Sequence, residues 1–160
     1  MVTIVTGRIN SGKTTTMLNR YEATHLGDGF VALKIMQGSS VYGYDLKQLC
    51  GQTYHWMIHQ SHYQNQFEDY AKFGPYLINL ATLTTINDIV NGLVAKHVSP
   101  IYFDEVGVLE LNGGGFHNAI AKILAANLDL VVAVRRDLVK PFIAHFKIKD
   151  YELINAQREE

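Results

Sequence analysis

Residues 7–14, Gly-Arg-Ile-Asn-Ser-Gly-Lys-Thr, constrain the fold of this 160-residue chain more than any other stretch. The β-branched run at 2–6 predicts a strand before them, and the pattern at 14–25 predicts a helix after them. The two glycines permit a turn whose successive N–H groups point inward, and the helix N-terminus adds about half a positive charge. The segment therefore predicts an anion-binding turn between a strand and a helix.

The same residues match G-x-x-x-x-G-K-[ST], the phosphate-binding loop or Walker A motif. In this motif the lysine reaches the β- and γ-phosphates of a nucleoside triphosphate, and the hydroxyl after it ligates Mg²⁺. Lys13 and Thr14 stand at those positions. A glycine turn that merely starts a helix is the alternative, which the strand and helix context disfavours. The predicted nucleotide contacts are Gly7, Arg8, Ile9, Asn10, Ser11, Gly12, Lys13, Thr14 and Thr15.

Two carboxylates, Asp104 and Glu105, follow a second apolar run at 101–103. Parallel strands end at one edge of their sheet, so we expect both carboxylates to lie beside the phosphate-binding loop. Asp104 is the predicted Walker B acid and, with Thr14, the predicted metal-binding pair; it would hold Mg²⁺ through a water. Glu105 is suited to orient or deprotonate an attacking water. An acidic pair solvated at a strand end is the alternative.

The rest of the chain alternates strand and helix patterns. Strands are predicted at 30–36, 101–103, 128–134 and around 146–154, and helices at 83–97, at 116–127 and briefly after 138. Residues 37–44 are predicted to be a loop, and 52–79 a hairpin or an irregular excursion rich in aromatic residues and histidine. The alternation predicts one α/β domain over residues 1–160, with a parallel-rich sheet and helices on both of its faces.

Composition excludes several classes of protein. The net charge of −1 provides no basic field that would favour nucleic acid as a partner. No apolar run approaches the roughly 20 residues that a membrane-spanning helix requires. The single cysteine, Cys50, cannot form an internal disulfide, fits a reducing cytoplasmic compartment and is interpreted as an inert buried thiol. The oligomeric state stays open.

Weaker candidates surround the two motifs. Arg135 and Arg136 follow an apolar run, and Arg135 is the better candidate for contacting the γ-phosphate as a catalytic residue. Glu110 either holds the acidic loop in place or lies on the surface. The histidines between 55 and 62 have spacings that could gather a metal, but no cysteine or carboxylate completes the set. The glycines at 113–115 are interpreted as a hinge or a plain connector.

The sequence resembles the THEP-type nucleoside-triphosphatase family, whose members carry a phosphate-binding loop and a D-E-[IV]-G-x-M-E-L stretch followed by a helix-opening Phe. Here that stretch is Asp-Glu-Val-Gly-Val-Leu-Glu-Leu at 104–111, with Phe116 after it. Gly29-Phe30, Gly43-Tyr44-Asp45 and Gly74-Pro75-Tyr76 look like shorter elements of the family. The resemblance implies a P-loop NTPase domain of RecA-like fold that slowly hydrolyses nucleoside triphosphates with a loose base preference.

The chain departs from the family at several charges. Lys34 and Met36 stand where a Glu and an Arg are usual, Val108 replaces a Lys, and an Arg before the Gly43 element is absent. These losses bear on substrate contacts and rate more than on nucleotide binding.

Three functions therefore compete. The first is Mg²⁺-dependent hydrolysis of ATP or GTP, with Lys13, Glu105 and Arg135 as catalytic residues. The second is a nucleoside or nucleotide kinase whose acceptor pocket comes from the aromatic segment and whose lid comes from 135–141. The third is a nucleotide-binding switch with negligible turnover. No N-K-x-D element selects guanine.

Overall fold

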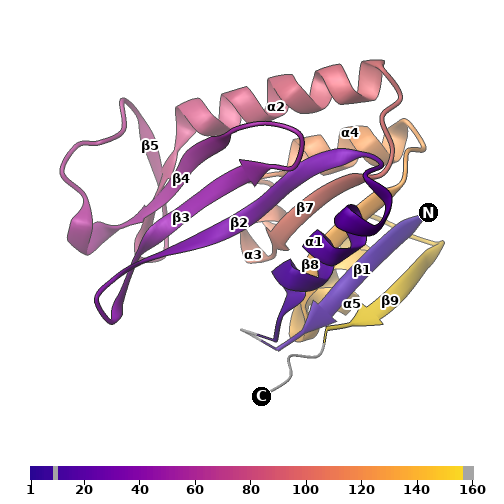
Figure 1. Ribbon diagram of the computed structural model, residues 1–160, viewed down its shortest axis with the longest axis horizontal. Coiled ribbons are helices and arrows are strands. Elements are labelled where there is room, and N and C mark those ends of the chain that lie inside the picture. The colour runs from indigo at the N-terminus through magenta and orange to yellow at the C-terminus, as the bar shows by residue number, and fades with distance from the viewer. Residues whose placement is uncertain (9–10, 157–160) are drawn as a thin grey trace.

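The computed structural model describes residues 1–8 and 11–156, and within them one nine-stranded sheet runs in the order β5-β6-β4-β3-β2-β7-β8-β1-β9. Figure 1 shows β5 and β9 at opposite ends of this sheet. The strands are β1 (Val2–Gly7), β2 (Asp28–Gln37), β3 (Ser40–Gln48), β4 (Thr53–His59), β5 (Tyr70–Phe73), β6 (Tyr76–Asn79), β7 (Ile101–Val106), β8 (Leu130–Arg135) and β9 (Tyr151–Asn155). The helices are α1 (Lys13–Thr24), η1 (Gln60–His62), α2 (Leu80–Ala95), α3 (Val108–Leu111), α4 (His117–Ala125), η2 (Arg136–Leu138) and α5 (Val139–His145).

The sheet has a parallel half and an antiparallel half. Strands β2, β7, β8, β1 and β9 pair in parallel, whereas β2, β3, β4, β6 and β5 pair antiparallel. Neighbouring parallel strands are connected by crossovers, usually helices, and the sequence pattern predicted such helices between strands. Antiparallel strands can be connected by short turns alone. The predicted α/β class is confirmed, and the sheet is mixed.

Helices cover both faces of the sheet, as predicted (Figure 1). Helix α1 packs Met17 and Tyr21 against one face, where they meet Val5 and Tyr102. The other face carries the larger core, to which α2, α4 and α5 contribute apolar side chains such as Ile86. Strands β1, β7 and β8 are buried along nearly their whole length, as expected for strands covered on both sides.

The predicted loop at 37–44 is wrong. Residues 40–44 belong to β3, which forms a hairpin with β2 through a turn at Gly38 and Ser39. The strand was missed because Gly38, Ser39 and Ser40 favour a loop, although Tyr42, Tyr44 and Leu46 alternate with Gly43, Asp45 and Lys47 along β3. In the segment 52–79 the predicted hairpin is present as β5 and β6, and β4 pairs with β6.

The expectation that Cys50 is a buried thiol is also wrong. Cys50 is exposed, in the turn between β3 and β4, where its Sγ lies 3.0 Å from the Tyr21 hydroxyl. The turn places it at the surface because β3 has already ended at Gln48. In the described part of the chain, no helix combines the length and apolar character that crossing a bilayer demands.

Candidate active site

The turn that the sequence predicts to bind phosphate, which we call the phosphate-binding turn, connects the end of β1 to the start of α1. Gly12 precedes the helix with φ +88°, a left-handed conformation that a residue with a Cβ adopts only with strain. At Gly7 a Cβ would lie 2.2 Å from the Ser11 Oγ, so the turn requires close approach there as well. The Ser11 N–H closes the turn by donating to the Arg8 carbonyl at 3.1 Å. Ile9 and Asn10, also predicted contacts, lie outside the described residues.

Lys13 lies within this turn. Its side chain is buried, and its Nζ donates to the Arg8 carbonyl at 2.8 Å, across the turn. Among the described residues, the buried Ser11 hydroxyl has no hydrogen-bond partner. A buried ammonium and an unpartnered hydroxyl at a helix N-terminus form a site that suits phosphate oxygens.

Thr14 and Asp104 meet although the strands that carry the two motifs are not neighbours. Strand β8 separates β1 from β7, yet the Thr14 Oγ1 donates to the Asp104 Oδ2 at 2.6 Å. The same oxygen accepts the Ala32 N–H of β2 at 3.0 Å. The structure therefore brings the predicted metal-binding pair together and fixes one carboxylate oxygen from two sides.

The surroundings of Asp104 suit a divalent cation. Burial, and after it the Glu105 charge, raise the pKa of the Asp104 carboxyl to about 6, while hydrogen bonds from Thr14 and two backbone N–H groups oppose that rise. A buried carboxylate and a hydroxyl are oxygen ligands of the kind that Mg²⁺ prefers. A cation beside Asp104 would offset the cost of ionising this buried carboxyl.

A β-bulge separates the roles of the two acidic residues. Phe103 and Val106 of β7 pair with Val132 and Val134 of β8, so Asp104 and Glu105 together oppose a single residue. Glu105 has φ +57° and is exposed, whereas Asp104 is buried. A bulge redirects side chains and commonly lies next to active sites. The sequence did not predict this bulge, because nothing in an Asp-Glu dipeptide indicates positive φ.

Glu110 supports the loop after β7. The structure buries it, and its two carboxylate oxygens accept the Gly107 N–H at 2.8 Å and the Phe116 N–H at 3.1 Å. Burial raises the pKa of the Glu110 carboxyl to about 7, despite these two donors. Of the two interpretations of Glu110, holding the acidic loop in place is the one that these contacts favour. A Cβ at Gly115 would meet the Glu110 Oε2, so the chain passes close to this carboxylate there.

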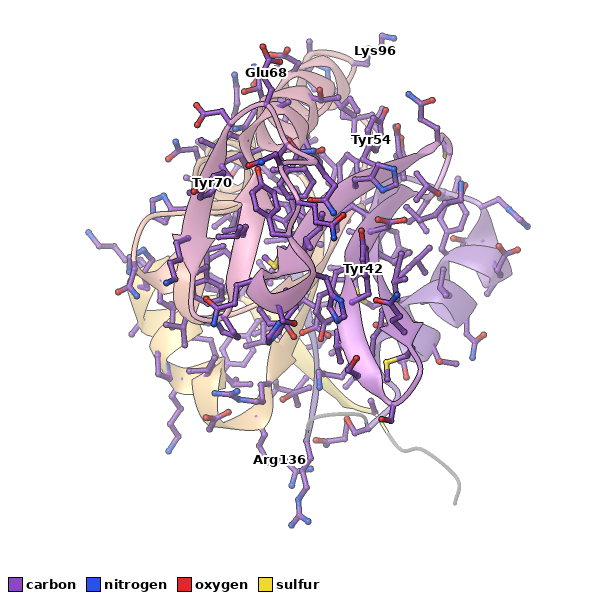
Figure 2. The ribbon with its side chains drawn as sticks, turned by 90° about the vertical axis from the view of Figure 1, so that its left-hand side faces the viewer. Tyr42, Tyr54, Glu68, Tyr70, Lys96 and Arg136 are labelled. Carbon is purple, nitrogen blue, oxygen red and sulfur yellow. The ribbon has the colours of Figure 1, made fainter. Side chains whose placement is uncertain are left out.

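The two arginines after β8 differ in direction. Arg135 pairs in register with Gly7 of β1 and lines the cavity over the phosphate-binding turn. Its Nη2 donates to the Asp137 Oδ2 at 3.0 Å. Arg136 points away from the body of the protein (Figure 2). The segment considered as a lid, 135–141, includes η2 and the start of α5, where Val139 is buried against the core.

A cavity of about 610 Å³ joins these elements. It is lined at one end by residues of the phosphate-binding turn and at the centre by Asp104 and Glu105. Beyond Glu105 it continues over the antiparallel half of the sheet. The segment 52–79 contributes Trp56, Met57, Phe73 and Tyr76 to the lining. Sequence reasoning noted Lys34, Tyr44 and Tyr76 only as family positions and did not single out Leu46, Met57 or Phe73, which also line the cavity.

The chain is similar to two solved structures over nearly its whole length. One is THEP1 from the hyperthermophile Aquifex aeolicus, with a TM-score of 0.70, 20% identity, and coverage of 98% of this chain and 90% of that one. The other is a human cancer-related nucleoside triphosphatase, with a TM-score of 0.69, 20% identity, and coverage of 98% and 89%.

These likenesses show a shared fold. No curated protein sequence gives a significant match. A profile of the family described as NTPase matches residues 2–160, and the chain belongs to that family.

Proposed function

We propose that this protein is a Mg²⁺-dependent nucleoside triphosphatase that cleaves the γ-phosphate of ATP or GTP. The observation that carries the proposal is the contact between Thr14 and Asp104, at 2.6 Å, next to the buried ammonium of Lys13. Phosphoryl transfer needs positioning and charge stabilisation more than covalent chemistry. A lysine, a hydroxyl and a carboxylate at the end of one cavity supply both.

Each residue of the turn would bind a part of the nucleotide. The backbone N–H groups and the Ser11 hydroxyl would hold phosphate oxygens, and Lys13 would leave the Arg8 carbonyl to bind the β- and γ-phosphates. Thr14 and Asp104 would hold Mg²⁺. When bound, Mg²⁺ neutralises charge on the β- and γ-phosphate oxygens.

Glu105 would act on the attacking water. Its exposed position in the cavity, next to the buried Asp104, suits a general base that takes a proton from water or orients it. The two neighbouring carboxylates thereby serve different partners. Arg135 would stabilise charge on the γ-phosphate after its guanidinium leaves Asp137.

The base of the nucleotide has no selective contact in this proposal. Neither a guanine-reading N-K-x-D element in the sequence nor a side chain of the phosphate-binding turn distinguishes ATP from GTP. We therefore propose loose base preference. The departures from the family's usual charges, a reversal at Lys34 and losses at Met36 and Val108, would lower the rate and leave binding intact, because binding depends on the turn itself.

Phosphate release from ATP and GTP, with Mg²⁺ and with EDTA, tests the proposal. We expect release only with Mg²⁺ and at similar rates for both nucleotides. Glu105→Gln should retain nucleotide binding and lose most turnover, whereas Lys13→Ala should weaken binding itself. Calorimetry with a non-hydrolysable analogue separates the two effects.

Tight binding without release of phosphate would overturn hydrolysis in favour of the switch. Absence of binding by the folded wild-type protein would overturn nucleotide recognition altogether. An unchanged rate in Glu105→Gln would remove Glu105 from catalysis.

A further inference from the structure

The cavity extends well past the residues that a triphosphate and its metal would contact. From Lys13 and Thr14 it passes Asp104 and Glu105 and reaches strands β3, β4, β5 and β6. Its far end is lined by six residues that we call the aromatic chamber: Tyr44, Trp56, Met57, Phe73, Tyr76 and Phe116. The cavity volume of about 610 Å³ lies in the range of ligand-binding pockets.

The chamber lies on the γ-phosphate side of the nucleotide site. In a phosphate-binding loop the lysine, the following hydroxyl and the acidic strand end mark the β- and γ-phosphates and their Mg²⁺. Here Asp104 lies on β7, and the chamber strands β3, β4 and β6 lie farther from β1 than β7 does. The nucleotide's own base belongs at the opposite end of the triphosphate. A second molecule in the chamber would therefore approach the terminal phosphate.

The chamber walls suit a flat ring that carries polar groups. Trp56 and Phe116 form a rigid, buried base beneath the chamber, stacked on one another with ring centroids 5.3 Å apart and planes inclined by 15°. Tyr44 meets Tyr76 edge to face at 5.6 Å, and both are partly exposed within the cavity. Aromatic faces stack on nucleobases of any kind. The Tyr44 and Tyr76 hydroxyls interact with each other, and because each can both donate and accept, they can also bond to a base or a sugar.

Glu105 stands where the two parts of the cavity meet. It is exposed, and the bulge in β7 separates its side chain from the buried Asp104. A carboxylate at this junction can accept a proton from a hydroxyl that enters from the chamber as readily as from water.

We propose that the aromatic chamber binds a nucleoside as a second substrate and presents one of its hydroxyls to the γ-phosphate. This proposal rests on the proposed nucleotide site. The nucleoside oxygen forms a bond to the γ-phosphorus, and the bond from that phosphorus to the β,γ-bridging oxygen breaks. The hydroxyl proton passes to Glu105 and then to solvent. The products are a nucleoside monophosphate and a nucleoside diphosphate. Water reacts in the same place when the chamber is empty.

The test measures both products in one reaction. Wild-type protein with ATP and Mg²⁺ is incubated with adenosine, guanosine, cytidine or thymidine, and phosphate and nucleoside monophosphate are followed by ³¹P NMR. We expect at least one nucleoside to be phosphorylated while phosphate release declines. Calorimetry should show that the nucleoside still binds when a non-hydrolysable ATP analogue saturates the protein.

Two chamber variants and one matched control make the test specific to this site. Phe73→Ala and Tyr76→Ala should each lower the ratio of nucleoside monophosphate to phosphate at least tenfold. Tyr70→Ala should leave the ratio and both rates unchanged, because Tyr70, labelled on the outer hairpin in Figure 2, is exposed and does not line the cavity.

The outcomes separate this inference from the proposed function. Phosphate release without nucleoside binding or phosphorylation would overturn the acceptor chamber and leave hydrolysis standing. Competition between the nucleoside and the ATP analogue would also overturn it, because the chamber would then hold the base of the triphosphate. Absence of nucleotide binding would overturn the proposed function first.

Discussion

The Thr14 hydroxyl donates to the Asp104 carboxylate at 2.6 Å, although the two residues are 90 positions apart in the sequence. The contact ties the first turn of α1 to the end of β7 across the intervening strand β8. The contact therefore holds the phosphate-binding turn and the acidic strand end in one arrangement, and the proposed phosphoryl transfer depends on positioning of this kind.

Replacing Thr14 tests this contact. Thr14→Val keeps the shape of the side chain and removes the hydroxyl, so the proposed ligand of Mg²⁺ and the donor to Asp104 are lost together. The measured quantity is the gain in nucleotide affinity that Mg²⁺ produces. We expect this gain to be smaller by a factor of about ten or more in Thr14→Val than in the wild type. Thr14→Ser, which keeps the hydroxyl, is the control. Mg²⁺ titrations of nucleotide binding provide the measurement. If Thr14→Val and Thr14→Ser showed the same dependence on Mg²⁺, Thr14 would be excluded from the metal site.

The left-handed backbone at Glu105 predicts a conflict between stability and activity. At φ +57° a residue with a Cβ is strained, and glycine relieves that strain by about 1 kcal/mol. Glu105→Gly should therefore be more stable than Glu105→Gln, and both should lose turnover. The glutamine variant controls for removing the charge beside Asp104. Chemical denaturation measures the difference, and a glycine variant that is less stable than the glutamine one would contradict stored strain.

The parts of the site that the sequence predicted are those whose chemistry depends on short motifs. Lys13, Thr14 and Asp104 followed from spacing alone, because only a strand-turn-helix and a buried strand end were needed to place them. The bulge at Asp104 and Glu105 depends on pairing with β8, and Tyr44, Phe73 and Tyr76 reach the cavity only through the register of antiparallel strands. In these hairpins the register is set by the turns and by which face is buried, and predicting a loop at 37–44 left the first of those turns unassigned.

Glu110 predicts a pH dependence of stability. Its pKa is raised from 4.5 to about 7 in the folded protein, so the folded state holds a proton that the unfolded state releases. The contribution to folding is fully present below about pH 4.5 and is lost as pH rises through 7, by about 3 kcal/mol in total.

The free energy of unfolding of the wild type relative to Glu110→Gln isolates this effect, because other titrating groups cancel. We expect the wild type to lose stability relative to the variant between pH 4.5 and 8. A difference that stays flat, or grows in favour of the wild type, would mean that the Gly107 and Phe116 N–H groups keep the carboxylate ionised.

A single methyl group added at Gly29 is expected to disrupt the sheet. Gly29 pairs with Tyr102 between β2 and β7, and a Cβ there would lie 2.2 Å from the Tyr102 carbonyl oxygen. Backbone cannot yield as a side chain does, so Gly29→Ala should lose at least about 3 kcal/mol of stability. Gly38→Ala is the control: its φ is +62°, but a Cβ meets nothing within 4 Å, so only the conformational cost of about 1 kcal/mol applies. Equal losses in thermal denaturation would contradict the clash.

The surface carboxylate of Asp137 and the γ-phosphate are expected to compete for the Arg135 guanidinium. Arg135 lines the cavity while its guanidinium binds the exposed Asp137 carboxylate through Nε and Nη2. The ion pair holds the guanidinium near the proposed nucleotide site, yet the guanidinium must leave Asp137 to contact phosphate. Because exposed ion pairs are weak, Asp137→Asn should lower KM for nucleotide only a few-fold and should not reduce kcat. Arg135→Ala should lower kcat by about 10³, the lower end of what an arginine supplies to phosphoryl transfer.

Arg136→Ala is the control and should match the wild type, because the Arg136 side chain points away from the protein in Figure 2. Steady-state phosphate release measures all three. If Asp137→Asn lost as much kcat as Arg135→Ala, the pair itself would be the catalytic arrangement, and Arg135 would act from its place beside Asp137.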